Sequence, residues 1–140
     1  MPRKSVLFIC THNSARSQMA EGLLRADLGD RFEAFSAGTE VTQVKPMAVR
    51  AMAEVGIDIS GHQSKTVDTF FGRQIDYVVT MCDSAREACP YFPARIEVMY
   101  QNFEDPSGME DTEGSDEQRL GAFRATRDEI RLWIKHQFGE

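Results

Sequence analysis

Cys10 and Arg16, with five residues between them, have the types and spacing needed to hold and attack an oxyanion. Residues 11–15 include no proline, so consecutive amides can donate to one anion while the guanidinium binds two of its oxygens. Asn13 tolerates the left-handed conformation of a tight loop, although an ordinary turn residue would look the same. Ser17 can donate to the Cys10 thiolate or serve as a helix N-cap. The residues expected to surround the anion are Thr11, His12, Asn13, Ser14, Ala15 and Arg16.

The flanking sequence predicts a strand before this loop and a helix after it. Val6-Leu7-Phe8-Ile9 is typical of a buried parallel strand, and Gln18 to Arg25 follow a helical pattern. A helix N-terminus at the loop favours bound anions and the thiolate form of a nearby cysteine.

The remaining chain predicts one α/β domain, residues 1–140, in three layers: a four-stranded, mainly parallel sheet flanked by helices. The other expected strands are 32–38, 76–81 and 95–100. Further helices are expected from Pro46 to Gly56 and through the apolar positions between Leu120 and Phe138. Phe70 and Phe71 are interpreted as core anchors, and the acidic stretch 104–117 as a solvated loop.

Three chemically capable residues should meet at one sheet edge. Ligands bind at the carboxyl ends of parallel strands, where Cys10, Cys82 and Asp105 each follow an expected strand.

The second pair with the same spacing, Cys89 and Arg95, does not predict another anion cradle. Pro90 and Pro93 lie between them and lack N–H donors, and a strand follows instead of a helix.

Cys82 and Cys89 are separated by six residues of short-helix composition. Unpaired cysteines and scattered histidines argue against zinc, so no metal site is expected. In a reducing compartment these thiols are free or redox-active, and a redox relay is the economical interpretation; a buried inert cysteine is the alternative for each.

The net charge of -6 and the lack of a basic run argue against nucleic acid and anionic membranes as partners. No signal peptide or long apolar run is present, so a cytoplasmic protein is expected, with a monomer as the default.

The motif from Cys10 to Ser17, together with Cys82, Cys89 and Asp105-Pro106, resembles the thioredoxin-coupled arsenate reductases. That family is built on the low-molecular-weight tyrosine phosphatase fold. The resemblance covers nearly the whole chain, including Ser36-Ala37-Gly38 and Gly56-Ile57-Asp58-Ile59-Ser60.

The resemblance implies reduction of arsenate to arsenite, an arsenic detoxification, with Cys10 as nucleophile and Asp105 as the acid for the leaving oxygen. Cys82 then attacks Cys10, Cys89 resolves that disulfide, and thioredoxin reduces the Cys82–Cys89 disulfide. No bound cofactor is expected. Phosphate or sulfate should compete with arsenate, and weak phosphatase activity is plausible because arsenate and phosphate share charge and shape.

A low-molecular-weight tyrosine phosphatase is the alternative enzyme. Those enzymes usually have glycine at position 12 and cysteine at position 15, where this chain has His12 and Ala15, and tyrosines where Ser107 and Gly108 follow Asp105-Pro106. A non-catalytic oxyanion-binding or redox-sensing module is the second alternative.

The resemblance also raises the question of a bound potassium ion. Some relatives hold potassium with residues matching Asn13, Glu21 and Ser36 plus an acidic residue, and Lys65 aligns with the last. The lysine ammonium can substitute for the ion, so no potassium requirement is expected.

Overall fold

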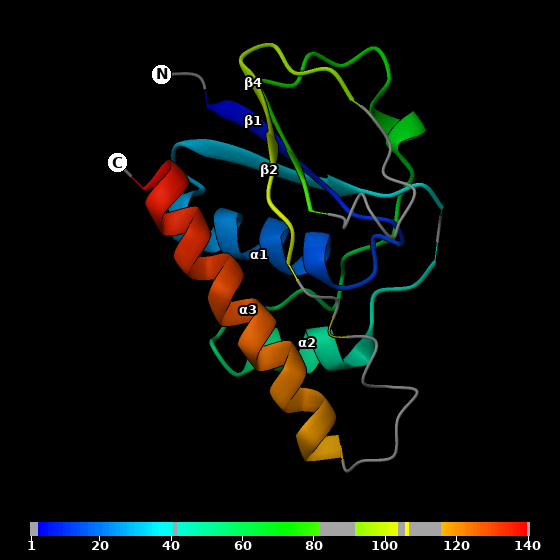
Figure 1. The fold of residues 1–140 in the computed structure, drawn as a ribbon, viewed down its shortest axis with the longest axis vertical. Helices are drawn as coiled ribbons and strands as arrows, with labels where there is room; N and C mark the ends of the chain where they lie inside the picture. The colour runs from blue at the N-terminus through cyan, green and yellow to red at the C-terminus, as the bar shows by residue number, and fades with distance from the viewer. Residues whose placement is uncertain (1–2, 41, 82–91, 104–105, 107–115, 140) are drawn as a thin grey trace.

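The computed structural model describes residues 3–40, 42–81, 92–103, 106 and 116–139 (Figure 1). In chain order, its elements are β1 (Lys4–Ile9), α1 (Arg16–Leu28), β2 (Phe32–Ala37), α2 (Pro46–Ala53), the 3-10 helix η1 (Val67–Phe70), β3 (Tyr77–Thr80), β4 (Glu97–Tyr100) and α3 (Asp116–Phe138). Among these described elements, none of the helices has the length and apolar character needed to cross a membrane.

The four strands form one sheet in the order β2-β1-β3-β4, and each neighbouring pair is parallel. Ile9 at the end of β1 is level with Ala37 on β2 and with Thr80 on β3. Thr80 is in turn level with Tyr100 on β4. The strands therefore end together at one edge, and the predicted parallel α/β sheet is confirmed.

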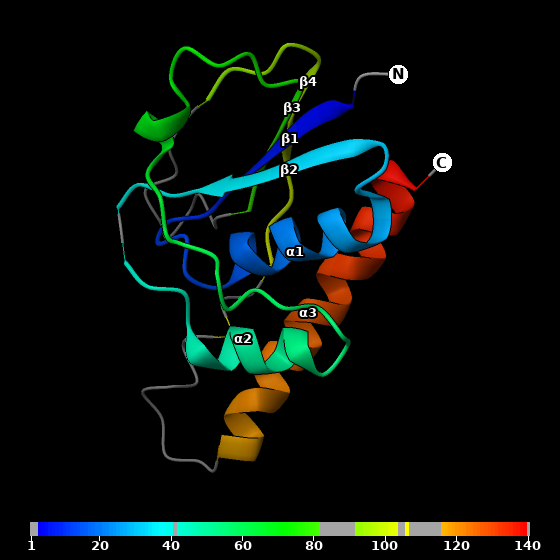
Figure 2. The same cartoon turned by 180° about the vertical axis from the view of Figure 1, so that it is seen from behind.

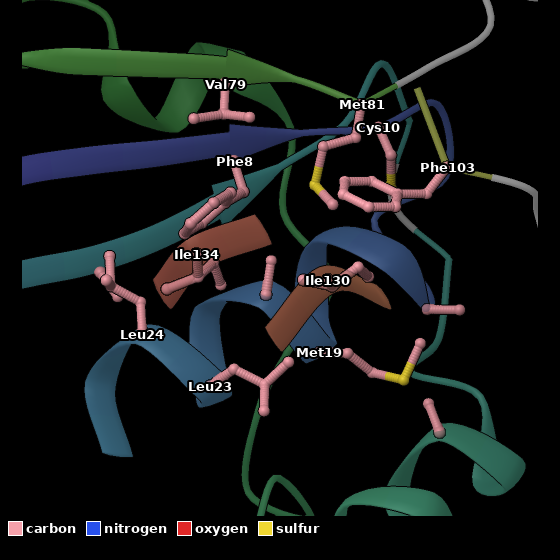
Figure 3. Packing of buried hydrophobic residues seen from close by; sticks show 14 of the residues in the cluster. Phe8, Cys10, Met19, Leu23, Leu24, Val79, Met81, Phe103, Ile130 and Ile134 are labelled. Carbon is pink, nitrogen blue, oxygen red and sulfur yellow. The ribbon is translucent and has the colours of Figure 1, made fainter. Parts of the chain in front are cut away.

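Helices α1, α2 and α3 form a layer on one face of the sheet (Figure 1). Val6 and Phe8 of β1 and Val79 of β3 pack against this layer, where Ile130 and Ile134 of α3 are buried (Figure 3). The helical spacing of the apolar residues on α3 thus corresponds to its buried face, as predicted.

The opposite face of the sheet is covered by η1 and the chain around it (Figure 2). Leu7 and Ile9, which alternate with Phe8 along β1, pack there with Val67 and Phe70. Because both faces of β1 are covered, its side chains from Val6 to Ile9 are all fully buried, which explains the continuous apolar run.

Phe71 differs from its predicted role as a core anchor. Phe70 is 2% exposed and meets Phe35 edge-on at 5.5 Å, but Phe71 is 61% exposed. The helical turn ends at Phe70 and Phe71 is extended, so its ring lies stacked on Phe92 at 5.8 Å with much of its surface open to solvent. Two adjacent aromatic residues at a helix end cannot both face the same core.

The last helix begins earlier than expected. The acidic composition predicts a loop that includes Asp116 and Glu117, but these two residues form the first turn of α3. Carboxylates are favourable there because the amide groups of a helix N-terminus carry partial positive charge. The rest of that stretch, apart from Pro106, lies outside the described residues.

Asp76, just before β3, connects β1 to the chain that leads into β4, at the edge of the sheet opposite Cys10. Its carboxylate accepts the Ser5 N–H at 2.9 Å and Arg95 Nε at 2.9 Å. The bond from Arg95, and then the one from the Ser5 backbone, lower the pKa of Asp76.

We expect Asp76→Asn to lower the free energy of unfolding by about 1 kcal/mol at neutral pH. The folded-state pKa lies below the unfolded value of about 3.9, so this contribution is present above that value and is lost as pH falls through the folded pKa. Urea unfolding of both proteins at neutral and strongly acidic pH measures the difference, with the exposed Asp30→Asn as control. If Asp76→Asn lowered the free energy of unfolding equally at both pH values, the effect would not come from the charge of the Asp76 carboxylate.

Candidate active site

Cys10 lies directly after β1, in a loop that ends where α1 begins at Arg16. The residue is 2% exposed, and its side chain lies near those of Met81 and Phe103 (Figure 3). The predicted strand, loop and helix are thus present. The N-terminus of α1 follows the loop, which favours an anion at this place.

The carbonyl groups of the loop are held by hydrogen bonds from outside it or from α1. The bonds are Thr39 N and Oγ1 to Thr11 O, Thr42 Oγ1 and Ser64 Oγ to His12 O, Gln18 Nε2 to Asn13 O, Lys45 N to Ser14 O, and Met19 N to Ala15 O, at 2.8–3.2 Å. Five successive carbonyls are therefore engaged.

The amide groups of residues 12–15 have no recorded acceptor within the part of the chain that the structure describes. Asn13 has φ 48°, the left-handed conformation predicted for it. A left-handed residue within a tight loop turns neighbouring amides toward one point, a known geometry for anion binding. The loop can therefore receive the oxygens of a tetrahedral anion.

Gly38 permits the close approach of β2 to this loop. A Cβ atom there would lie 2.7 Å from Cys10 O and Thr11 O and 2.9 Å from Asn13 N, distances that real Cβ atoms essentially never show. Gly38 is a residue of the site that the sequence alone does not predict. The available signal was its place, a glycine at the end of a strand next to the one carrying the cysteine.

The amide orientation of Asn13 decides the direction of the hydrogen bond to Cys10. The Lys65 backbone N–H can only donate, so the atom it meets at 2.8 Å is Asn13 Oδ1. Asn13 Nδ2 therefore donates to Ser17 Oγ at 2.8 Å, which leaves the Ser17 hydroxyl proton for Cys10 Sγ at 2.9 Å. A donor aimed at sulfur favours the thiolate over the thiol.

This network continues through Gln18 to His62. Gln18 Nε2 donates to Asn13 Oδ1 and Gln63 O, so Gln18 Oε1 faces His62 Nδ1 at 3.0 Å. Arg25 Nη1 lies 3.0 Å from His62 Nε2 and can only donate, which places the proton of a neutral ring on Nδ1. Burial lowers the pKa of His62, and Arg25 and Lys65 lower it further against the opposite effect of Glu21.

Glu21 is a buried carboxylate with several partners. Ser36 Oγ donates to it at 2.6 Å, Arg25 Nη2 at 2.8 Å, and Lys65 Nζ lies 4.0 Å away. The residues at the four positions of the relatives' potassium site are thus close together in this chain: Asn13, Glu21, Ser36 and Lys65. The lysine ammonium supplies positive charge beside the carboxylate.

Arg16 is 2% exposed, with Nη1 3.4 Å from Met81 O and from Phe103 O. These carbonyls follow β3 and β4, so the guanidinium lies across the edge where the strands end. Met81 N–H also bonds to Ile9 O at 2.8 Å, which brings the end of β3 to the start of the loop.

Cys82, Cys89 and Asp105 lie outside the described residues. Within the described part, no group of three or more histidine, cysteine or acidic side chains could hold a metal ion.

A sequence profile of the low molecular weight phosphotyrosine protein phosphatase family matches residues 5–137. The chain therefore belongs to this family. It is 45% identical over 135 residues to an arsenate reductase of Halalkalibacterium halodurans, covering 96% of this chain and 95% of that protein. It is 43% identical to an arsenate reductase of Staphylococcus aureus, with 96% of each covered.

Solved structures agree with this assignment. An arsenate reductase from Archaeoglobus fulgidus superposes with a TM-score of 0.77 at 33% identity, over 96% of this chain and 99% of that one. A low molecular weight protein tyrosine phosphatase from T. tengcongensis gives 0.70 at 31%, over 94% and 95%. A thioredoxin-dependent arsenate reductase from Corynebacterium glutamicum gives 0.65 at 28%, over 99% of this chain and 64% of that one.

Removing the Ser17 hydroxyl should make Cys10 Sγ less reactive, because its hydrogen bond from Ser17 is lost. We expect Ser17→Ala to slow alkylation of Cys10 by iodoacetamide roughly threefold to tenfold at neutral pH, because a hydrogen bond to the anion is lost. Mass spectrometry of the Cys10 peptide measures the rate, and Ser60→Ala, whose hydroxyl bonds to Asp58, is the control. Equal rates at neutral pH would contradict this role.

Lys65 leads us to expect no stabilisation by potassium. A bound cation raises the melting temperature of a folded protein, whereas an internal ammonium needs no added ion. The wild type should melt at the same temperature in potassium and sodium chloride at equal ionic strength. Lys65→Gln, which keeps a polar side chain without the charge, is the variant for comparison. A rise in the melting temperature of the wild type that is specific to potassium would contradict the expectation.

Proposed function

We propose that this chain reduces arsenate to arsenite. The observation that carries the proposal is the Cys10 loop, where a thiol receives the Ser17 hydrogen bond beside the amides of residues 12–15, which have no recorded acceptor among the described residues. The names of the relatives aligned over 96% of the chain support arsenate as the oxyanion. The proposal assigns arsenate binding to the amides of residues 11–15 and to Arg16.

In the first step, the Cys10 thiolate attacks arsenic and a sulfur–arsenic bond forms. One oxygen of arsenate leaves as water after protonation, for which Asp105 is the proposed acid. The thiolate is the reactive form, and the Ser17 bond together with the N-terminus of α1 favours it.

In the second step, the Cys82 thiolate attacks Cys10 Sγ. The Cys10–Cys82 disulfide forms, and the electron pair of the sulfur–arsenic bond stays on arsenic, which leaves as arsenite. Two electrons thus pass from two thiolates to arsenic. The position of Met81 supports this step, since its bond to Ile9 O brings the chain to the Cys10 loop one residue before Cys82.

In the third step, Cys89 attacks Cys82 and releases the Cys10 thiolate. The Cys82–Cys89 disulfide is then reduced by the dithiol of thioredoxin, which becomes oxidised in turn. The Corynebacterium glutamicum neighbour, described as thioredoxin-dependent, supports this reductant. Phosphate and sulfate are expected to compete for the loop, and any phosphatase activity is a weak side reaction.

The decisive assay couples arsenate reduction to NADPH oxidation through thioredoxin and its reductase, with glutaredoxin and glutathione as the comparison. The wild type should turn over with thioredoxin. Hydrolysis of an aryl phosphate without arsenite formation would instead identify a phosphatase, as the T. tengcongensis neighbour is described.

Cys89→Ser separates the relay from a simpler mechanism. We expect this variant to form a single arsenite per protein molecule and then stop, because the Cys10–Cys82 disulfide cannot be passed on. Mass spectrometry of the stalled protein should find that disulfide. Turnover as fast as the wild type would show that the three-cysteine relay is wrong, while arsenate reduction as such would stand.

A further inference from the structure

His12 is the loop residue most open to solvent at the Cys10 site. Its side chain is 49% exposed, whereas residues 13–17 are buried. His12 is thus the side chain that the anion loop presents to solvent, and we call this exposed part of the loop its mouth.

A carboxylate accompanies His12 at this mouth. Glu40 Oε1 accepts the His12 Nδ1 proton at 2.6 Å, and the Glu40 side chain is itself 57% exposed. The segment that carries Glu40 also holds the loop, through Thr39 on Thr11 O and Thr42 on His12 O. Glu40 is thus brought to the anion loop by the contacts that shape it.

A carboxylate in this place opposes the binding of a dianion, because like charges repel over several ångströms at low salt. A protonated imidazole bonded to it cancels the charge. The His12 backbone is held separately, since its carbonyl accepts hydrogen bonds from Thr42 and Ser64. The side-chain pair is therefore not needed to fix the loop backbone.

We propose that His12 and Glu40 form an ion pair that sets the charge at the mouth of the Cys10 loop and thereby the affinity for tetrahedral dianions. Glu40 orients the ring through Nδ1, and His12 compensates the carboxylate. Both are positioning residues that govern binding and take no part in bond making. The inference rests on the proposed oxyanion function of the loop.

Sulfate is the suitable probe because it is a dianion across the working pH range and does not react with thiols. Its affinity is measured by titration calorimetry at mildly acidic pH. The variants are His12→Asn, which keeps a donor for Glu40 without charge, Glu40→Gln, which keeps an acceptor without charge, and the double variant. Glu97→Gln, an exposed carboxylate at the other edge of the sheet, is the control.

His12→Asn should bind sulfate roughly fivefold more weakly at about 0.05 M salt, and the loss should largely disappear at about 0.5 M. Glu40→Gln should bind at least as tightly as the wild type. The double variant should return to within about twofold of it, since neither charge remains. Glu97→Gln should leave the affinity unchanged.

Two results would overturn the inference while the proposed function stood: wild-type affinity in His12→Asn, or equal weakening in His12→Asn and Glu40→Gln without recovery in the double variant. The second would show that the pair supports geometry alone. A wild type that binds no sulfate would overturn the anion site itself and with it the proposed function.

Discussion

The carbonyl groups of residues 11–15 cannot turn toward Cys10, because each is already bonded to a neighbouring segment or to α1. A peptide unit is planar, so holding the carbonyl outward directs its amide inward. Parallel pairing of β1 with β2 and the bridge between Gly38 and Thr66 bring these partners to the loop. The anion cradle is thus produced by the surrounding fold as much as by the loop itself.

The same constraint orders the side chains around the nucleophile. A backbone N–H, that of Lys65, fixes the Asn13 amide, and Asn13 in turn fixes the direction in which Ser17 donates to Cys10. The Lys65 N–H permits only one orientation of the Asn13 amide, and Asn13 Nδ2 then leaves Ser17 Oγ only its own proton to donate. The hydrogen bonds themselves therefore determine that Ser17 is the donor to Cys10 Sγ. The cost of burying Glu21 is offset by Arg25, Ser36 and Lys65, so the charges beneath the loop are compensated.

The family contains proteins described as phosphatases and as arsenate reductases, and an anion loop suits both. What distinguishes them chemically is the fate of the sulfur–oxyanion intermediate, which water attacks in hydrolysis and a second thiol attacks in reduction. In the mechanism that we propose, Cys82 and Cys89 are these thiols. Met81 supports their role because the chain reaches the loop there, at the end of the strand next to β1.

Sequence periodicity predicted the strands, the helices and the loop that joins β1 to α1, because buried strands and amphipathic helices have patterns that local sequence shows. Residue type and place predicted the left-handed Asn13, which is confirmed. They left Ser17 as either a donor to Cys10 or a helix N-cap, and the structure has the bond to Cys10 with no side-chain cap on α1. The exposed ring of Phe71 was not predicted, because two adjacent apolar residues look alike in a sequence.

By itself, then, the sequence determined a parallel α/β domain with a thiol and an arginine around an anion loop. Only the tertiary structure decided how that loop is held, through Gly38, Thr39 and Ser64, and what stands at its mouth, through the pairing of His12 with Glu40. These partners lie 25 to 52 positions from the loop residues that they contact. No local pattern encodes such contacts, because they arise only when the strands pair in register.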